Sequence, residues 1–220
     1  MNLPIIIDFA PIKNLKEYKR LIYNVKDHVN QVILKDYYYP NDYLYEIIAY
    51  TKQHGIDINY TTSGEAFTPE KVEILKMCRR VNVVMNYSAL KMLIDAGVTT
   101  NIVLTDPMKF TMNFNGVNAV VFTGFEVTKE FLDIVNKGPY KIGIDPCMII
   151  RNSNNEQKLI CEYARIRAHV TSEMKLQPCA FSKEDGVDIT SIKEAWYSDL
   201  FQKFRSKLEE KPFECPWKSW

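Results

Sequence analysis

The chain has 220 residues, which suits one large domain or one domain with a small appendage. Its hydrophobic fraction of 46% supports a packed core, and its net charge of +1, without a long basic tract, argues against nucleic acid as a main partner. No apolar run approaches the roughly 20 residues that span a bilayer, and the N-terminal segment resembles a strand and not a signal peptide, so we expect a cytosolic protein that does not enter a membrane.

The first 145 residues alternate between short apolar runs and segments with helical periodicity. The expected strands are residues 3–10, 29–34, 56–62, 81–88, 99–106, 118–126 and 140–145. The expected helices are residues 14–28, 41–55, 68–80, 88–97 and 127–138. In the third helix, Thr68 is the expected cap and Pro69 the first helical residue.

Seven strands that are mostly separated by helices predict a parallel sheet. The apolar runs do not alternate with polar residues, which is typical of strands covered on both faces. The number of units favours a parallel (β/α) barrel, complete or partial, over a doubly wound sheet. The dinucleotide-binding pattern G-x-G-x-x-G and the P-loop pattern are both absent from the sequence. In a barrel, the chemistry is expected at the carboxyl ends of the strands.

From about residue 146 the pattern changes. A polar loop at 151–158 precedes an expected hairpin, with strands at 164–171 and 176–181. One long helix is expected over 191–210, and its apolar stripe consists of Ile192, Trp196, Leu200, Phe204 and Leu208. We therefore divide the chain into a barrel at 1–146 and a cysteine-containing C-terminal region at 147–220.

Four of the five cysteines lie in the last third of the chain: Cys147, Cys161, Cys179 and Cys215. In a cytosolic protein they are not expected to form disulfides, which leaves apolar filler or ligands. The fifth, Cys78, belongs to the amphipathic segment EKVEILKMCRR and is expected in the core.

Several segments resemble radical SAM proteins of the SPASM/twitch type, and the resemblance covers nearly the whole chain. Residues 42–72 and 88–105 are similar to the helix–strand units of that family. Cys161 and Cys179 keep the spacing of its C-terminal cysteines, with Met174 at the position where glycine is usual. PCAFS at 178–182 and EAWYSDLFQKFR at 194–205 match its C-terminal run. ECP at 214–216 resembles the start of its CPxC motif, with Lys218 at the place of the second cysteine.

The chain also departs from that family at the sites that perform its chemistry. The loop after the first strand, APIKNLK, carries none of the cysteines of the CxxxCxxC motif that holds the radical cluster. KDYYYP stands where GGEP binds S-adenosylmethionine, and tyrosines do not let a ligand approach the backbone as glycines do. Only Thr61, Thr62, Ser63 and Gly64 keep the character of the family's cofactor site. Binding of S-adenosylmethionine is thus in doubt, and its radical cleavage is not expected.

The resemblance implies that the four C-terminal cysteines lie together at one end of the barrel. Four thiolates can hold a [4Fe–4S] cluster that has no open iron. Zinc is an alternative, although structural zinc sites usually show C-x₂₋₄-C pairs, and unmetallated thiols are another. The basic residues nearby either hold a negative cluster or form the polar face of the hairpin; they are Arg165, Arg167, His169 and Lys175.

Other candidate residues lie at expected strand ends. Tyr37, Tyr38 and Tyr39 either line a binding site or fill the vacated cofactor pocket. A set of carboxylates can supply an acid–base pair or cap loops, and it consists of Asp36, Glu65, Asp106, Glu126 and Asp145.

The expected function is that of a radical-SAM-like binding or partner protein, in the context of peptide or protein modification, with one auxiliary iron–sulfur cluster. One alternative is an enzyme, either with a radical cluster moved to three of the C-terminal cysteines or with metal-independent chemistry at the barrel rim. A structural scaffold is a further alternative.

Overall fold

The computed structural model describes residues 3–36, 43–65, 67–106, 109–110, 113–124, 128, 131, 133, 137–145, 147 and 160–216. The strands of these residues form one sheet, in the order β10-β9-β8-β1-β2-β3-β4-β5-β6-β7. Its strands are β1 (Ile6–Phe9), β2 (Gln31–Asp36), β3 (Asp57–Thr62), β4 (Arg80–Val84), β5 (Thr100–Leu104), β6 (Ala119–Phe122), β7 (Ile142–Ile144), β8 (Arg167–Val170), β9 (Lys175–Gln177) and β10 (Val187–Asp188).

The helices follow the strands in the order that the sequence predicts. Their bounds are α1 (Leu15–Val25), α2 (Leu44–Gln53), α3 (Pro69–Leu75), α4 (Tyr87–Asp95), α7 (Ile192–Trp196) and α8 (Asp199–Glu210). The helix expected at 127–138 lies largely outside the described residues. Within the described part of the chain, no helix is long and apolar enough to cross a membrane.

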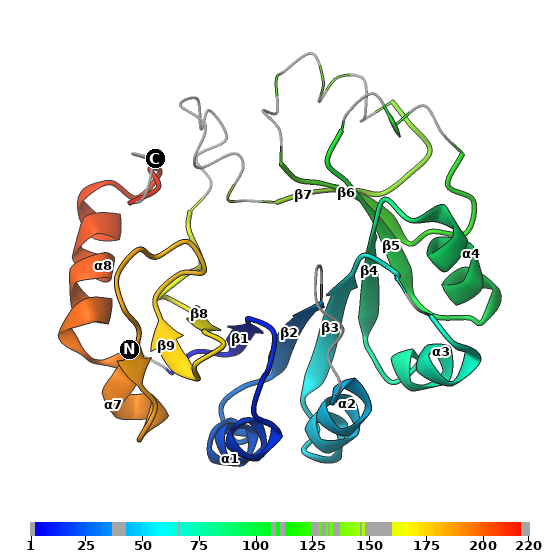
Figure 1. Ribbon diagram of the computed structural model, residues 1–220. Helices are drawn as coiled ribbons and strands as arrows, with labels where there is room; N and C mark the ends of the chain where they lie inside the picture. Colours follow the sequence, from blue (N-terminus) through cyan, green and yellow to red (C-terminus); the bar gives the residue numbers. More distant parts are fainter. Residues whose placement is uncertain are drawn as a thin grey trace.

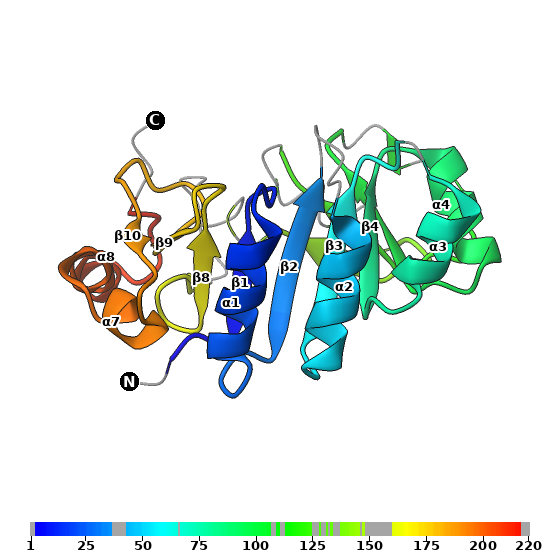
Figure 2. The same ribbon diagram turned by 60° about the horizontal axis from the view of Figure 1, so that its bottom comes forward.

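Strands β1 to β7 pair in succession and in parallel, and the sheet bends into an arc with α1–α4 on its convex side (Figure 1). Seen from below, α1 and α2 lie across the strands that they connect (Figure 2). The arc leaves the described sheet open, because β7 and β10 are its two ends. The architecture is therefore the partial parallel (β/α) barrel that the sequence predicts.

Caps in the sequence set the starts of the helices. The side chains of Asn14 and Asn86 accept hydrogen bonds from backbone N–H groups in the first turns of α1 and α4. Thr68 does the same for α3, with Pro69 as the first helical residue, which confirms that expectation. Each of these helices then buries one apolar stripe against the sheet, such as Tyr18, Leu21, Ile22 and Val25 in α1.

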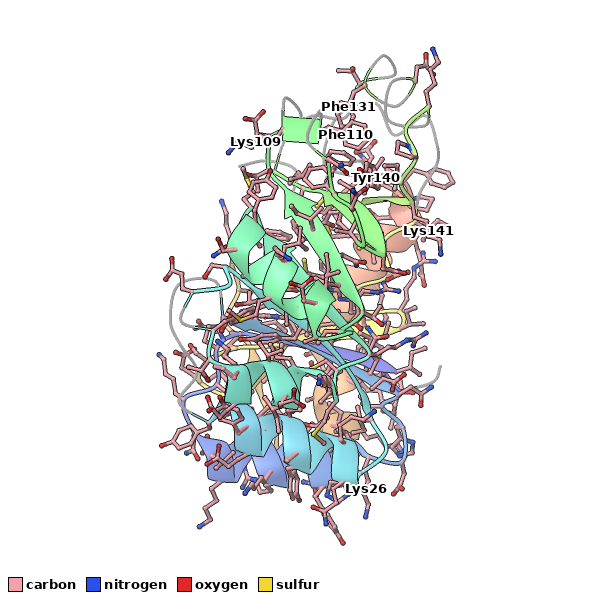
Figure 3. The ribbon with its side chains drawn as sticks, turned by 90° about the vertical axis from the view of Figure 1, so that its right-hand side faces the viewer. Lys26, Lys109, Phe110, Phe131, Tyr140 and Lys141 are labelled. Atoms are coloured by element: carbon pink, nitrogen blue, oxygen red, sulfur yellow. The ribbon has the colours of Figure 1, made fainter. Side chains whose placement is uncertain are left out.

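The outer side of β5 and β6 is covered by aromatic side chains. The Phe110 ring contacts those of Phe122 and Tyr140 edge to face, with centroids 5.4 and 6.3 Å apart, and Phe131 lies 4.8 Å from Phe122. Figure 3 shows Phe110, Phe131 and Tyr140 gathered at this end of the molecule, beside Lys109 and Lys141. The Tyr140 hydroxyl also accepts the backbone N–H of Phe114 at 2.9 Å. These rings bury the apolar face of two strands.

The C-terminal region continues the sheet of the barrel. Strands β8 and β9 form the expected antiparallel hairpin, and β8 also pairs in parallel with β1, from Ile6 opposite Arg167 to Phe9 opposite Val170. In the turn of the hairpin Met174 has a φ of 61°, a left-handed conformation that favours glycine. This is the position at which the similar family usually has glycine.

The single helix expected over 191–210 is wrong, because two helices meet at Ser198. The backbone of Ser198 is extended, with φ −60° and ψ 161°, so the helical phase restarts there. Consequently Phe201, and not Leu200, is buried together with Phe204 and Leu208. Helical periodicity continues only while each residue has helical φ and ψ angles, so the extended Ser198 interrupts it.

The restart places Arg205 in the interface between the two helices and the sheet. Its Nε and Nη2 groups donate to the carbonyl oxygens of Ala164 and Trp196, both at 2.7 Å. The guanidinium lies 4.6 Å from the centre of the Trp196 ring. The residue is 7% exposed, and it thereby connects α8, α7 and the loop before β8.

Replacing Arg205 by methionine is expected to lower the free energy of unfolding by about 2–4 kcal/mol, because two buried carbonyl groups lose their donors. The exposed Lys203 lies on the same helix, and Lys203→Met is the control, with an expected change below about 0.5 kcal/mol. Urea unfolding of both variants measures the effect. Equal stabilities would contradict the role given to Arg205.

Candidate functional site

The concave face of the sheet carries many polar side chains. In β2 the positions that face the helices are buried, whereas Gln31, Ile33 and Lys35 alternate to the other side and are partly exposed. The same alternation places a set of polar side chains on the concave face: Asp8, Lys35, Asn59, Thr61, Arg80, Asn82, Asn101, Arg167 and His169. The same register also places Ile6, Ile33, Val103 and Val121 on this face, so polar and apolar positions are mixed there.

Asp8 of β1 lies at the centre of this face. Its carboxylate accepts a hydrogen bond from the Tyr163 hydroxyl at 2.8 Å and pairs with Lys35 Nζ at 3.0 Å and Arg167 Nη2 at 3.2 Å. His169 Nδ1 is 3.9 Å from the other oxygen. Asp8 is 0% exposed, while the Lys35 and Arg167 side chains keep 29% and 22% of their surface in solvent. The group, which we call the Asp8 cluster, consists of Asp8, Lys35, Tyr163, Arg167 and His169.

The Asp8 cluster stabilises the ionised carboxylate. Burial alone would raise the pKa of Asp8, but the charge of Lys35, the charge of Arg167 and the nearby His169 hold that pKa well below its usual range. Arg167 also lies over the ring of Tyr163, 4.7 Å from its centre. Two strands from opposite ends of the sequence, β1 and β8, are thus joined by a charged contact as well as by backbone pairing.

A row of amides crosses the concave face on the next strands. The Asn118 side chain donates to Asn101, which donates to Asn82, both at 2.8 Å, and Asn82 donates to Thr61 Oγ1 at 3.2 Å. The row follows the register of the strands, in which Thr61 is opposite Asn82 and Asn82 opposite Asn101. A ligand in the arc would therefore meet hydrogen-bonding groups over four adjacent strands.

The segment Thr61–Gly64, expected at a cofactor site, divides between two surroundings. Thr61 takes part in the amide row, whereas the Thr62 hydroxyl accepts the N–H of Gly64 at 3.0 Å. Gly64 has a φ of 74°, and a Cβ there would lie 2.4 Å from that of Ala89. Close packing against the start of α4 therefore explains the glycine, and a role for Ser63 and its neighbours in binding a cofactor stays a prediction.

Two of the carboxylates expected at the rim, Asp36 and Asp145, have different surroundings. Asp36 faces the helices, where it accepts the Tyr60 hydroxyl and lies 3.5 Å from Lys71 Nζ. Burial raises the pKa of Asp36, although bonds from Tyr60 and Thr62 and the charge of Lys71 oppose it. Asp145 accepts the backbone N–H of Cys147 at 3.0 Å, which is the loop role considered for it. Glu126 and Tyr37–Tyr39 lie outside the described residues.

The four C-terminal cysteines lie near one another, in four separate segments. Cys147 follows β7, Cys161 precedes β8, Cys179 follows β9 and Cys215 follows α8. Cys161 and Cys179 are 8% and 4% exposed, and Cys147 and Cys215 pack partly buried against the same core. Cys78 is buried between α3 and β4, as expected for core filler.

The thiols influence one another electrostatically. Burial raises the pKa of Cys147, and the charges of Asp145, Cys161 and Cys179 raise it further. Burial raises the pKa of Cys179 to about 12, with further contributions from Cys161 and Cys215. Cys161 responds to Cys215 in the same sense, while Arg165 and Arg167 act in the opposite direction. Each of the four thiols is thereby close enough to at least two others to affect its ionisation.

Two of these sulfurs accept backbone hydrogen bonds in the same pattern. The N–H of Phe181 points to Cys179 Sγ at 3.3 Å, and that of Tyr163 to the Cys161 sulfur, in each case two residues on. Such bonds to sulfur tune iron–sulfur sites. Among the described residues, no three His, Cys, Asp or Glu side chains are arranged around a single ion position.

Sequence reasoning missed most of the Asp8 cluster. Asp8 is the only charged residue in the apolar run LPIIIDFA, and a carboxylate in a strand of that kind requires buried partners. That signal was present, but the partners Lys35 and Tyr163 lie far away in the sequence. Arg167 and His169 were considered only in relation to the cysteines.

Neither the known family profiles nor the curated proteins include a match to this chain. Among solved structures, SuiB from Streptococcus suis bound to S-adenosylmethionine matches with a TM-score of 0.73 and 12% identity, over 93% of this chain and 66% of that chain. SuiB bound to its precursor peptide SuiA matches with the same score and identity, over 94% and 67%. The N-terminal domain of a putative aldolase from Bacteroides vulgatus gives 0.50 at 12% identity, over 94% and 87%.

The likeness to SuiB extends over nearly the whole of this chain. The chain thus has an α/β fold like that of the SuiB structures, with a mostly parallel sheet that forms a partial barrel. It spans about two thirds of the length of SuiB. At this level of identity the likeness concerns the fold.

Replacing Asp8 by asparagine is expected to lower the free energy of unfolding by about 2–4 kcal/mol at pH 7, because Lys35 and Arg167 lose their carboxylate. The pKa of Asp8 is lowered in the folded state, so its contribution is complete above the unfolded value of about 3.9 and is lost as the pH falls below it. The difference between the wild type and Asp8→Asn should therefore shrink from pH 7 to pH 3 in urea unfolding.

The matched control is Asp57→Asn, which removes a carboxylate that is 41% exposed and pairs with Lys52 and Arg79. Its expected cost is below about 1 kcal/mol at pH 7. An Asp8→Asn variant as stable as this control would contradict the central place of Asp8.

Proposed function

We propose that the chain is a radical-SAM-like binding protein that does not cleave S-adenosylmethionine. In this proposal Cys147, Cys161, Cys179 and Cys215 hold one [4Fe–4S] cluster, and the barrel takes part in peptide or protein modification as a partner. The observation that carries the proposal is the mutual nearness of these four cysteines, which come from four segments, while the loop after β1 has no cysteine.

The surroundings of the thiols support a cluster. Two of the sulfurs accept backbone N–H groups, and Arg165 and Arg167 lower the pKa of Cys161 against the effect of its burial. A cluster with four thiolates is anionic, so nearby guanidinium groups favour it. It would also replace protons on buried thiols, which makes binding more favourable at higher pH. Because each of its four irons would be bound to one cysteine, the cluster would have no open iron and would serve structure or electron transfer.

The Met174 conformation supports the twitch-type assignment of residues 147–220. A left-handed residue stands between Cys161 and Cys179, at the position where the family has glycine. In the SuiB structures the related fold binds S-adenosylmethionine in one case and a precursor peptide in another. These observations favour a peptide as partner, and the cytosolic location expected from the sequence is part of the proposal.

Protein purified without oxygen is expected to contain about four irons and four sulfides per chain and to show a broad absorption band in the blue. Cys161→Ser and Cys179→Ser should each reduce the iron content to below about one per chain, since each removes a ligand. Cys78→Ser is the control and should keep the full content. Iron-free protein, or an equal iron content in all variants, would contradict the cluster. One zinc per chain in place of iron would show that the cysteines form a zinc site.

An active enzyme is the second candidate, in which three of the four cysteines hold the cluster and one iron is open. The proposal predicts that the reduced, iron-loaded protein forms no 5′-deoxyadenosine from S-adenosylmethionine beyond the level seen without protein. Liquid chromatography of the reaction measures this product. Multiple turnovers that disappear in Cys179→Ser would establish the enzyme and rule out a purely binding role.

A further inference from the structure

The Asp8 cluster carries more positive than negative charge. Lys35 and Arg167 both pair with the carboxylate of Asp8, and no other carboxylate among the described residues forms an ion pair with either of them. Two permanent cations thus face one anion, which leaves one positive charge in surplus even when His169 is neutral. Both cations retain contact with solvent on the concave face. A surplus of this kind at a partly dry surface attracts an anion.

Polar atoms of the cluster are also left without hydrogen-bond partners. Arg167 Nε and His169 Nδ1 are buried and make no hydrogen bond, and His169 as a whole is 8% exposed. A buried polar group that stays unpaired is destabilising, so a ligand that pairs with it is favoured. Both residues extend from β8 toward the same face as Asp8, since Asp8 lies opposite His169 and Ile6 opposite Arg167 in the strand register.

We propose that Lys35, Arg167 and His169 bind a carboxylate group of a small polar ligand inside the arc of the sheet. The surplus of one charge matches a carboxylate, whereas a phosphate monoester brings about −1.5 to −2. A guanidinium with a free Nε–H is also suited to carboxylate oxygens. The site uses none of the cysteines, and it shares only Arg167 with the surroundings of the proposed cluster.

The adjoining strands indicate what else the ligand contains. Next to the Asp8 cluster on the concave face are the amide row and two further buried atoms without partners, Asn59 Oδ1 and Arg80 Nε. Asn59 and Arg80 are opposite each other in the register of β3 and β4. One offers an acceptor and the other a donor, which is the pattern that a peptide group satisfies. The ligand class is therefore an acid that also carries amide groups, such as the C-terminal end of a peptide.

The test uses N-acetylglycine, which has one carboxylate and one amide, and N-acetylglycinamide, its uncharged counterpart. Titrations are followed by the ¹⁵N signals of the imidazole of His169, at constant ionic strength so that general screening is equal. The acid should shift the His169 signals and bind at least about tenfold more tightly than the amide, which corresponds to about 1.4 kcal/mol. Equal affinities for the two probes would overturn the proposal.

Lys35→Met should weaken binding of N-acetylglycine at least tenfold, and Lys35→Arg, which keeps the charge, should stay within about threefold of the wild type. Lys91→Met is the control, because Lys91 is a surface residue paired with Asp95 on α4, and it should leave the affinity unchanged. Unchanged binding in Lys35→Met would overturn the proposal. Lys35→Arg retains the ion pair with Asp8. If neither Lys35 variant folds, the comparison of N-acetylglycine with N-acetylglycinamide on the wild type tests the proposal.

Two further titrations test the kind of anion that binds and the independence of this site from the cysteines. Inorganic phosphate that binds at least tenfold more tightly than N-acetylglycine would make this a phosphate site and overturn the carboxylate. The Cys161→Ser variant should bind N-acetylglycine as the wild type does. Binding that emerges only in this variant would mean that the cysteine site already neutralises Arg167, and it would overturn a separate ligand site.

Discussion

The carboxylate of Asp8 connects the two parts of the chain that the sequence separates. It is fully buried on β1 and is surrounded by Lys35 from β2 and by Tyr163 and Arg167 from the segment that follows the barrel. A buried charge is tolerated only with such partners, so the position of β8 beside β1 is a condition for Asp8 to be there. The segment that this pairing joins to β1 also carries Cys161, Cys179, α7 and α8.

The order of strands and most helices could be predicted from the sequence because each element carries its own signal. The periodic stripe of α1, the Thr68–Pro69 start of α3 and the apolar strands are local features that tertiary contacts did not override. The break at Ser198 could not be seen, since the residues on both sides have good helical periodicity and the turn between them depends on Arg205 and its two distant carbonyl partners. The extra strand β10 has only two residues and likewise lacks a local pattern.

For the site, the sequence indicated the residue types but not their surroundings. The cysteines were conspicuous because proline follows or precedes several of them and their spacing resembles a known pattern. Their nearness to one another agrees with that reading, although sulfur ligation itself is still a proposal. The Asp8 cluster was hidden because its members are up to 161 positions apart, from Asp8 to His169, and only the parallel pairing of β1 with β8 brings them into one row. Amides such as Asn82 and Asn101 look unremarkable in a strand until their common face is known.

The continuity of the sheet also affects how the chain can be divided. Residues 1–146 contain β1 to β7 with their helices, and a fragment of that length would seem a natural unit. Without β8, however, β1 would become an edge strand with a row of unpaired backbone groups, and Asp8 would lose Tyr163 and Arg167. Such a fragment would be prone to edge-to-edge association. The C-terminal segment is thus a protective cover for the first strand of the barrel, in addition to anything that its cysteines bind.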